Sequence, residues 1–188
     1  MKHWRLSWGQ QWLVIGMIVI LSCLSFAGAA WAGLNDDRYD GNMFALYAGN
    51  GSLVPPRITL AQSLRQEKPA LLMFYVDDSS DCKQFSSVIS QLQAPYGRAA
   101  SFVPIMADSI RVKDHYEPTE PGYYFTGSVP QTVVLDEAGT VRLNETGYVN
   151  YETIDDVMRE VFGLLPRSES VELRRRPVNE LNTELVGS

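Results

Sequence analysis

The chain has 188 residues and is 45% hydrophobic, which suits one globular domain with a targeting segment and tails and leaves too little for two full domains. Twenty-two acidic residues outnumber 16 basic ones, giving a net charge of −6. This excess of negative charge argues against nucleic acid as a partner.

The first 32 residues have the three parts of an export signal. A basic start is followed by an apolar stretch over residues 12–26 and by the small-residue motif Ala30-Trp31-Ala32. We therefore expect residues 1–32 to be a signal peptide cleaved after Ala32. An uncleaved membrane anchor is the alternative, because residues 12–32 are uncharged and about 20 such residues cross a bilayer.

In both cases Lys2 and Arg5 stay on the cytoplasmic side and the domain is translocated. Cleavage removes these two basic residues and no acid, so that 14 basic residues would face 22 acidic ones, a net charge of −8. Lipidation at Cys23 is a third alternative, although Ile20-Leu21-Ser22 is a poor version of the small-residue sequence that precedes such a site.

Residues 33–52 show turn signals and no clear periodicity, so we expect a loosely ordered lead-in linker. Leu53 and Val54 are predicted to form a short edge strand that the next two prolines end. Residues 58–65 carry apolar side chains at helical spacing and predict a helix. The folded domain is expected over residues 53–166, with a flexible charged tail over residues 167–188.

Residues 71–76 are apolar throughout, which predicts a central strand covered on both faces by helices. From Cys82 the apolar residues recur at helical spacing until Ala94-Pro95, and residues 102–106 predict a further strand. Residues 108–128 contain several prolines and glycines, so that at most residues 110–116 are helical.

Residues 132–135 and 141–143 flank a DEAGT turn and predict an antiparallel hairpin at the end of the sheet. Residues 151–162 then carry a strong apolar face, which predicts a final helix with Asn150 as its N-cap.

The polar turn after residues 71–76 ends in Cys82, the only cysteine outside the targeting segment. Thiol-disulfide enzymes exchange an internal disulfide between two cysteines at C-x-x-C spacing, but the first of these positions is Ser79, whose hydroxyl cannot form that bond. We expect Cys82 to be a buried thiol, with a mixed disulfide to a partner as the alternative. Ser80 or Asp81 is predicted to cap the helix, with Gln84 completing a capping box.

The charges near Cys82 act in opposite directions. Helix-terminal amides favour a thiolate, whereas Asp77, Asp78 and Asp81 oppose it by like-charge repulsion, so no strong activation is expected. His115, the sole histidine after the targeting segment, does not make a zinc site with one buried thiol, and we expect no metal and no cofactor. Spacing alone leaves a Cys-His nucleophilic pair open, although a surface position for His115 is the favoured reading.

Two further clusters are ambiguous. Tyr123-Tyr124-Phe125 are predicted to be core residues, with anchoring of a partner as the alternative. The Arg174-Arg175-Arg176 run is surrounded by glutamates and is expected to be part of a solvated tail.

The order of these elements over residues 53–165 resembles the thioredoxin fold, an α/β fold with a mixed central sheet flanked by helices. Its sharpest features are Phe74-Tyr75-Val76 leading into Cys82-Lys83 and the pair Val129-Pro130 before the hairpin. The resemblance implies that Pro130 is cis and that the Val129 backbone pairs with an extended peptide by strand addition. The implied peptide-binding groove is lined by Ser79, Ser80, Cys82, Val129 and Pro130.

The chain departs from the family's W-C-G-P-C motif, because Asp78-Ser79-Ser80-Asp81-Cys82 lacks its attacking cysteine, tryptophan and proline. With this acidic S-S-D-C turn it resembles cyanobacterial thylakoid proteins described as photosystem I accumulation factors. The resemblance implies a non-catalytic assembly factor of the thylakoid membrane or lumen that binds a photosynthetic membrane protein or an assembly intermediate. The alternatives are a monothiol oxidoreductase using Cys82, a permanent structural subunit, and a location in the periplasm.

Overall fold

The computed structural model describes residues 8–25 and 33–170. The chain divides into two units, residues 1–33 and residues 34–188. The described part of the first unit is the helix α1 (Trp8–Ser25), and the proposed cleavage motif at Ala30–Ala32 lies outside the described residues. Among the residues described, no helix combines the length and apolar character that crossing a bilayer requires.

The second unit is built on a four-stranded mixed sheet in the order β2-β1-β3-β4. Its strands are β1 (Ala70–Tyr75), β2 (Ser101–Met106), β3 (Gln131–Leu135) and β4 (Val141–Thr146). β1 pairs with β2 in parallel and with β3 antiparallel, and β3 and β4 form the predicted antiparallel hairpin. The central position of β1 explains its unbroken apolar sequence, since all six of its residues are buried.

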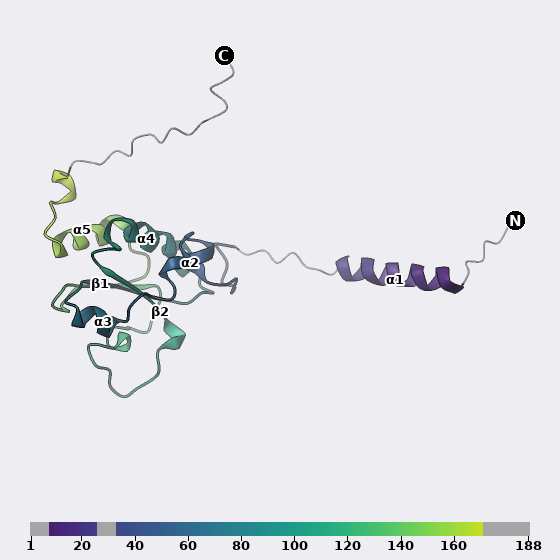
Figure 1. Ribbon diagram of the computed structural model, residues 1–188, viewed down its shortest axis with the longest axis horizontal. Helices are drawn as coiled ribbons and strands as arrows, with labels where there is room; N and C mark the ends of the chain where they lie inside the picture. The colour runs from purple at the N-terminus through teal and green to yellow at the C-terminus, as the bar shows by residue number, and fades with distance from the viewer. Residues whose placement is uncertain (1–7, 26–32, 171–188) are drawn as a thin grey trace, which may run out of the picture. The chain divides into compact units, whose positions relative to one another are not determined.

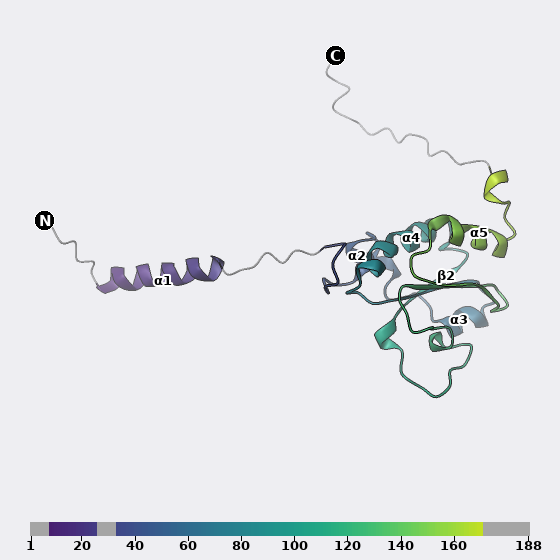
Figure 2. The ribbon, with the colours of Figure 1, turned by 180° about the vertical axis from the view of Figure 1, so that it is seen from behind.

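Successive side chains of β1 point to opposite faces and enter two separate clusters. Leu71, Met73 and Tyr75 pack with residues of the helices α2 (Met43–Leu46), α4 (Ser80–Tyr96) and α5 (Tyr151–Val161). Leu72 and Phe74 pack on the other side with Leu60 of α3 (Leu60–Arg65). Figures 1 and 2 show the same arrangement, with α2, α4 and α5 over one face of the sheet and α3 over the other. The predicted covering of the sheet on both faces is thus confirmed.

The helices of this unit are α2 (Met43–Leu46), α3 (Leu60–Arg65), α4 (Ser80–Tyr96) and α5 (Tyr151–Val161). Short 3-10 turns occur at Gly51–Leu53, Ala107–Ser109, Pro121–Tyr123 and Arg167–Glu169. α4 continues one residue past Pro95 instead of ending before it. Asn150 caps α5 as predicted, because its side-chain oxygen accepts a hydrogen bond from the amide of Thr153 at 2.8 Å.

The short edge strand predicted at Leu53 and Val54 is not present. Leu53 belongs to a 3-10 turn and Val54 to no strand, because Leu53 is buried in the core by the turn itself and needs no partner strand. Residues 110–116 contain no helix, which is within the predicted limit, and 3-10 turns lie on either side of them at Ala107–Ser109 and Pro121–Tyr123.

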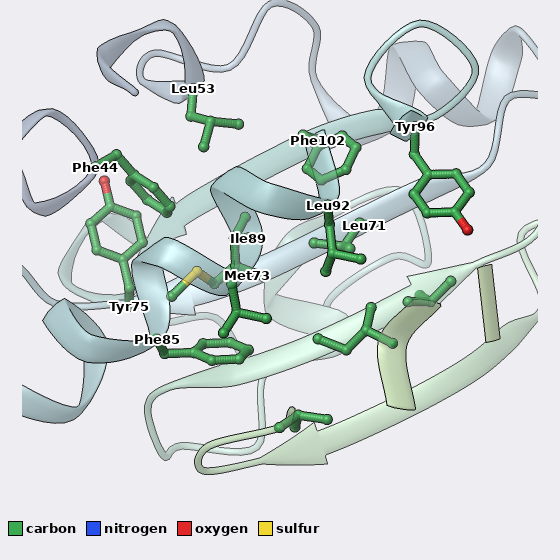
Figure 3. Packing of buried hydrophobic residues seen from close by; sticks show 14 of the residues in the cluster. Phe44, Leu53, Leu71, Met73, Tyr75, Phe85, Ile89, Leu92, Tyr96 and Phe102 are labelled. Carbon is green, nitrogen blue, oxygen red and sulfur yellow. The ribbon is translucent and has the colours of Figure 1, made fainter. Parts of the chain in front are cut away.

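The segment 33–52, expected to be a loose lead-in, is an integral part of the domain. Met43 and Phe44 on α2 are fully buried, and the ring of Phe44 meets that of Tyr75 edge-on at 5.3 Å between centroids (Figure 3). One helical turn is too short to show periodicity, so the sequence pattern missed it. The domain core therefore begins about ten residues before the predicted boundary at Leu53.

The start of the predicted tail is also held to the domain. Arg167 forms ion pairs with Asp155 at 3.3 Å and with Asp156 at 2.9 Å, both on α5. The remainder of the tail, including the arginine run at 174–176, lies outside the described residues.

Candidate functional site

The polar turn after β1 is organised by Ser79, not by the residues that follow it. Ser79 is the N-cap of α4, and its hydroxyl accepts a hydrogen bond from the backbone amide of Cys82 at 3.3 Å. The predicted caps Ser80 and Asp81 are instead the first two residues of the helix. Ser79 has extended backbone angles, as an N-cap requires, and this places its oxygen over the amide three residues on.

Cys82 is a fully buried free thiol on the inner side of α4. Burial raises the pKa of this thiol, and the charges of Asp81 and Asp78 add to the shift, while hydrogen bonds from Val76 and Ser79 act in the opposite direction. A raised pKa and a lack of exposure both disfavour nucleophilic attack, since the thiolate is the reactive form. The sequence prediction of a buried, unactivated thiol agrees with this environment.

The segment that leads into α2 and ends at its first residue crosses the N-terminal end of α4; we call residues 35–43 the strap. The carboxylate of Asp37 accepts a hydrogen bond from the backbone amide of Ser80 at 2.8 Å, and this bond lowers the pKa of Asp37. Farther along, the backbone amide of Met43 donates to the Asp77 carboxylate at 2.9 Å. The strap therefore occupies backbone and side-chain groups that flank the turn.

Lys83 holds the middle of the strap. Its buried ammonium donates to the backbone carbonyls of Asp36 at 3.0 Å and Arg38 at 2.6 Å, and it lies 3.2 Å from the Asp36 carboxylate and 2.8 Å from that of Asp40. Burial lowers the pKa of Lys83, whereas its hydrogen bonds to Asp40 and Asp36 raise it. The effects that raise the pKa outweigh burial, so the pKa of Lys83 lies above its usual value. Lys83 is charged, and it ties a partly buried set of oxygens to α4.

The second wall of the predicted groove is the loop before β3. The Val129-Pro130 bond is cis, as the resemblance implied, and so is Val54-Pro55. The carbonyl of Pro130 accepts a hydrogen bond from the amide of Gly147 at 2.7 Å. Within the described part of the chain, neither the amide nor the carbonyl of Val129 makes a hydrogen bond, and the residue is half-buried. Val129 therefore offers a free backbone donor and acceptor.

Aromatic contacts connect this loop with α4. Phe85, one turn after Cys82, meets Tyr148 edge-on at 5.6 Å between ring centroids, and Tyr148 follows the glycine that bonds to Pro130. Tyr148 is 63% exposed, whereas Phe85 is buried. The contact between Phe85 and Tyr148 therefore joins the two walls of the predicted groove, and the Tyr148 ring is exposed at the surface.

The five predicted groove residues differ in which polar groups they leave available to bind a peptide. The Ser79 hydroxyl and the Ser80 amide are hydrogen-bonded within the chain, Cys82 is inaccessible, and Pro130 is buried. Among these five residues, Val129 is the one whose amide and carbonyl both lack a hydrogen-bond partner in the described part of the chain. Asp37 and Tyr148 were not predicted from the sequence. Lys83 was noticed only as part of the Cys82-Lys83 motif, because its partners Asp36 and Asp40 lie more than 40 positions away in the chain.

The other candidates take no part in this site. His115 has a side chain 77% exposed and lies 3.8 Å from the Glu117 carboxylate, which agrees with a surface position and is incompatible with direct contact to the buried Cys82. Tyr124 is buried, while Tyr123 is 53% exposed. No group of three or more metal-binding side chains lies close enough to hold an ion among the residues described.

A mixed four-stranded sheet, a cis-proline directly before β3 and a capped cysteine turn at the start of the long helix α4 define a thioredoxin-like protein. Residues 57–162 match the family described as thioredoxin-like domain, and the chain belongs to that family. The strap lies before the matched range.

The chain is 52% identical over 163 residues to thylakoid membrane protein slr1796 of Synechocystis sp., covering 87% of this chain and 81% of that protein. Among solved structures, it is 21% identical to the germline-specific thioredoxin Deadhead of Drosophila melanogaster, with a TM-score of 0.41 over 53% of this chain and 88% of the other. A structure described as a malarial protein is 15% identical, with a TM-score of 0.40 over 50% of this chain and 96% of that one.

Proposed function

We propose that this chain is a non-catalytic accessory factor of the thylakoid membrane that binds an extended segment of a photosynthetic membrane protein and supports photosystem I accumulation. The similarity to a thylakoid membrane protein over most of the chain supports the location. The resemblance of the S-S-D-C turn to photosystem I accumulation factors supports the choice of partner.

The observation that carries the binding role is the free backbone of Val129. An amide and a carbonyl without partners beside a sheet are the groups to which an extended peptide adds as a strand. Tyr148 supplies an exposed ring near the same loop, and such rings anchor partners at interfaces. A peptide bound here needs neither a thiol nor a cofactor.

The arrangement at the turn argues against dithiol chemistry. The hydroxyl of Ser79 stands where an attacking sulfur is needed and is engaged in capping α4. Cys82 has no exposed surface, and its raised pKa keeps it protonated. The turn is therefore better suited to fixing the shape of a binding surface than to exchanging electrons.

The charge around the turn indicates what kind of segment binds. Asp37, Asp78 and Asp81 are all exposed at the N-terminal end of α4. Like charges on one surface attract a partner of opposite sign and repel one of the same sign. We accordingly propose a partner segment that carries lysine or arginine.

A strain lacking the gene tests this function through its content of photosystem I. We expect a reduced content that is restored by the unchanged gene and by Cys82→Ser, but not by Tyr148→Ser. Val112→Ser is the matched control, because Val112 is 97% exposed and belongs to a different loop. A normal content in the deleted strain would refute the photosystem role.

The second candidate is a monothiol oxidoreductase. It is favoured by the position of Cys82 at the third residue of α4, where helix-terminal amides stabilise a thiolate. An insulin-reduction assay on the purified protein and on Cys82→Ser separates the two functions. Turnover that is lost in Cys82→Ser would establish the enzyme and overturn the non-catalytic role.

A permanent structural subunit differs from an assembly factor in stoichiometry. The proposed factor is scarce in finished photosystem particles and enriched with assembly intermediates. Equimolar recovery with the finished particle would instead identify a subunit. Separating thylakoid from periplasmic fractions in the same strain tests the location, which we propose to be the thylakoid membrane or lumen.

A further inference from the structure

A cavity of about 540 Å³ lies at the C-terminal end of α4, the opposite end of that helix from the turn. Its wall includes Arg57, Lys68 and Arg98, together with the apolar residues Leu53, Ala100 and Phe102. The volume falls within the range of pockets that bind small ligands, about 300–1,000 Å³. None of the residues of the predicted groove contributes to it.

The charges of this cavity are of one sign. Arg57 precedes α3, Lys68 precedes β1 and Arg98 follows α4, so three separate segments bring cations to one place. No aspartate or glutamate lines the cavity, and these three side chains form no ion pair or hydrogen bond with any residue in the described ranges. By contrast, Arg159 and Arg167 are paired with carboxylates.

This concentration of positive charge is unusual in a chain with a net charge of −6. The carbonyl end of α4 contributes an opposing charge equivalent to about half an elementary charge, which is small beside three full positive charges. A concave wall of one sign also focuses its field, so the local potential attracts anions although the chain as a whole repels them.

The inner wall contains apolar side chains and one unpaired hydroxyl. Leu53 and Phe102 are 2% and 8% exposed and belong to the core cluster shown in Figure 3. Ser101, also in the wall, has a buried hydroxyl without a hydrogen-bond partner among the described residues. Buried polar groups are nearly always bonded, so this unpaired hydroxyl is unusual for a residue in the wall of a cavity.

We propose that this cavity binds a phosphate-bearing anion, with Arg57, Lys68 and Arg98 holding the phosphate oxygens. Arginine pairs with such oxygens in a bidentate manner, and lysine adds a point charge. The same chemistry is offered by a free phosphate compound and by the headgroup of an anionic phospholipid. The apolar wall gives the lipid an additional contact.

Calorimetric titration of the full chain in nonionic detergent tests the proposal with two probes, inorganic phosphate and a short-chain phosphatidylglycerol. Sodium chloride keeps the ionic strength constant, because screening alone weakens such contacts. Saturable binding of either probe is expected. Tighter binding of the lipid identifies a headgroup as the ligand, and equal or tighter binding of phosphate identifies a free anion.

Arg57→Gln and Arg98→Gln, made separately, should each weaken binding about tenfold, the effect of losing one charge-assisted contact. Arg65→Gln is the matched control, because this substitution removes the same charge at an exposed residue that lies outside the cavity wall. Both cavity arginines are exposed, so their replacement should leave the thermal midpoint unchanged. Absence of saturable binding of both probes, or equal weakening by Arg65→Gln, overturns the proposal.

Discussion

The hydroxyl of Ser79 accepts a hydrogen bond from the amide of Cys82, so the two positions that form a disulfide in dithiol thioredoxins are joined here by a helix cap. The cap satisfies one of the amides that the first turn of α4 leaves without an intrahelical partner. Ser79, which occupies the position of the attacking cysteine, therefore has a structural role as the cap of α4.

Ser79→Ala removes this cap and should destabilise the domain by about 1 kcal/mol, the usual cost of losing an N-cap side chain. Urea denaturation of both proteins measures the difference. Ser87→Ala is the matched control, because its hydroxyl bonds only to the Gln84 carbonyl within the same helix. Equal stability of Ser79→Ala and the unchanged protein would show that the cap contributes nothing.

Cys82 should resist alkylation as long as the domain is folded. Burial both shields the thiol and raises its pKa, so iodoacetamide at pH 8 should label it only after denaturation. Mass spectrometry of the digested protein distinguishes Cys82 from Cys23 and reports each separately. Rapid labelling of Cys82 in the native protein would instead reveal an accessible thiolate.

Lys83→Met keeps the length of the side chain and removes the cation that holds the strap. Two carboxylates and two backbone carbonyls lose their donor, and we expect a loss of roughly 3 kcal/mol in the free energy of unfolding. Hydrogen exchange should become faster in residues 35–43 than in β1. Lys113→Met is the control, because Lys113 forms a more exposed ion pair with Glu120.

Asp77 should give a distinct pH dependence of stability. Burial raises the pKa of this carboxyl above its usual 3.8, and the charge of Asp78 adds to the shift, so the folded state binds the proton more tightly than the unfolded state. The contribution of Asp77 to stability is therefore greatest at low pH and falls as pH rises from 3.8 through the folded-state pKa.

Asp77→Asn keeps an acceptor for the Met43 amide and removes the titration. The stability of the unchanged protein relative to this variant should decline as pH rises through that window, as measured by denaturation at several pH values. Asp81→Asn serves as a control at an exposed position. A difference that is constant with pH, or that grows as pH rises, would contradict the expected sign.

The sequence predicted the features that depend on local pattern. The apolar run over residues 71–76 predicted the central strand, which is Ala70–Tyr75, and the apolar spacing from Cys82 onward marks α4. The position of Val129-Pro130 before a strand was enough for the resemblance to imply the cis bond. Strong periodicity predicts an element reliably because it follows from burial of one or two faces of that element.

The strap could not be predicted in this way, because its contacts join residues far apart in the chain. The Lys83 ammonium and the Asp36 carboxylate are separated by 47 positions, and neither position shows this relationship by itself. The N-cap of α4 was misplaced for a different reason. Ser79, Ser80 and Asp81 are all good capping residues, so only the backbone geometry distinguishes among them.

The buried ring of Phe44 and the counterions of Lys83 both precede Arg57, where the family match begins. A fragment limited to residues 57–162 would keep the Lys83 ammonium in the interior but lose its carboxylate partners. It would also leave an empty space beside Tyr75, where the Phe44 ring packs. The smallest autonomous folding unit of this protein is thus longer than its recognisable family signature, and it must include Asp36 and Asp40.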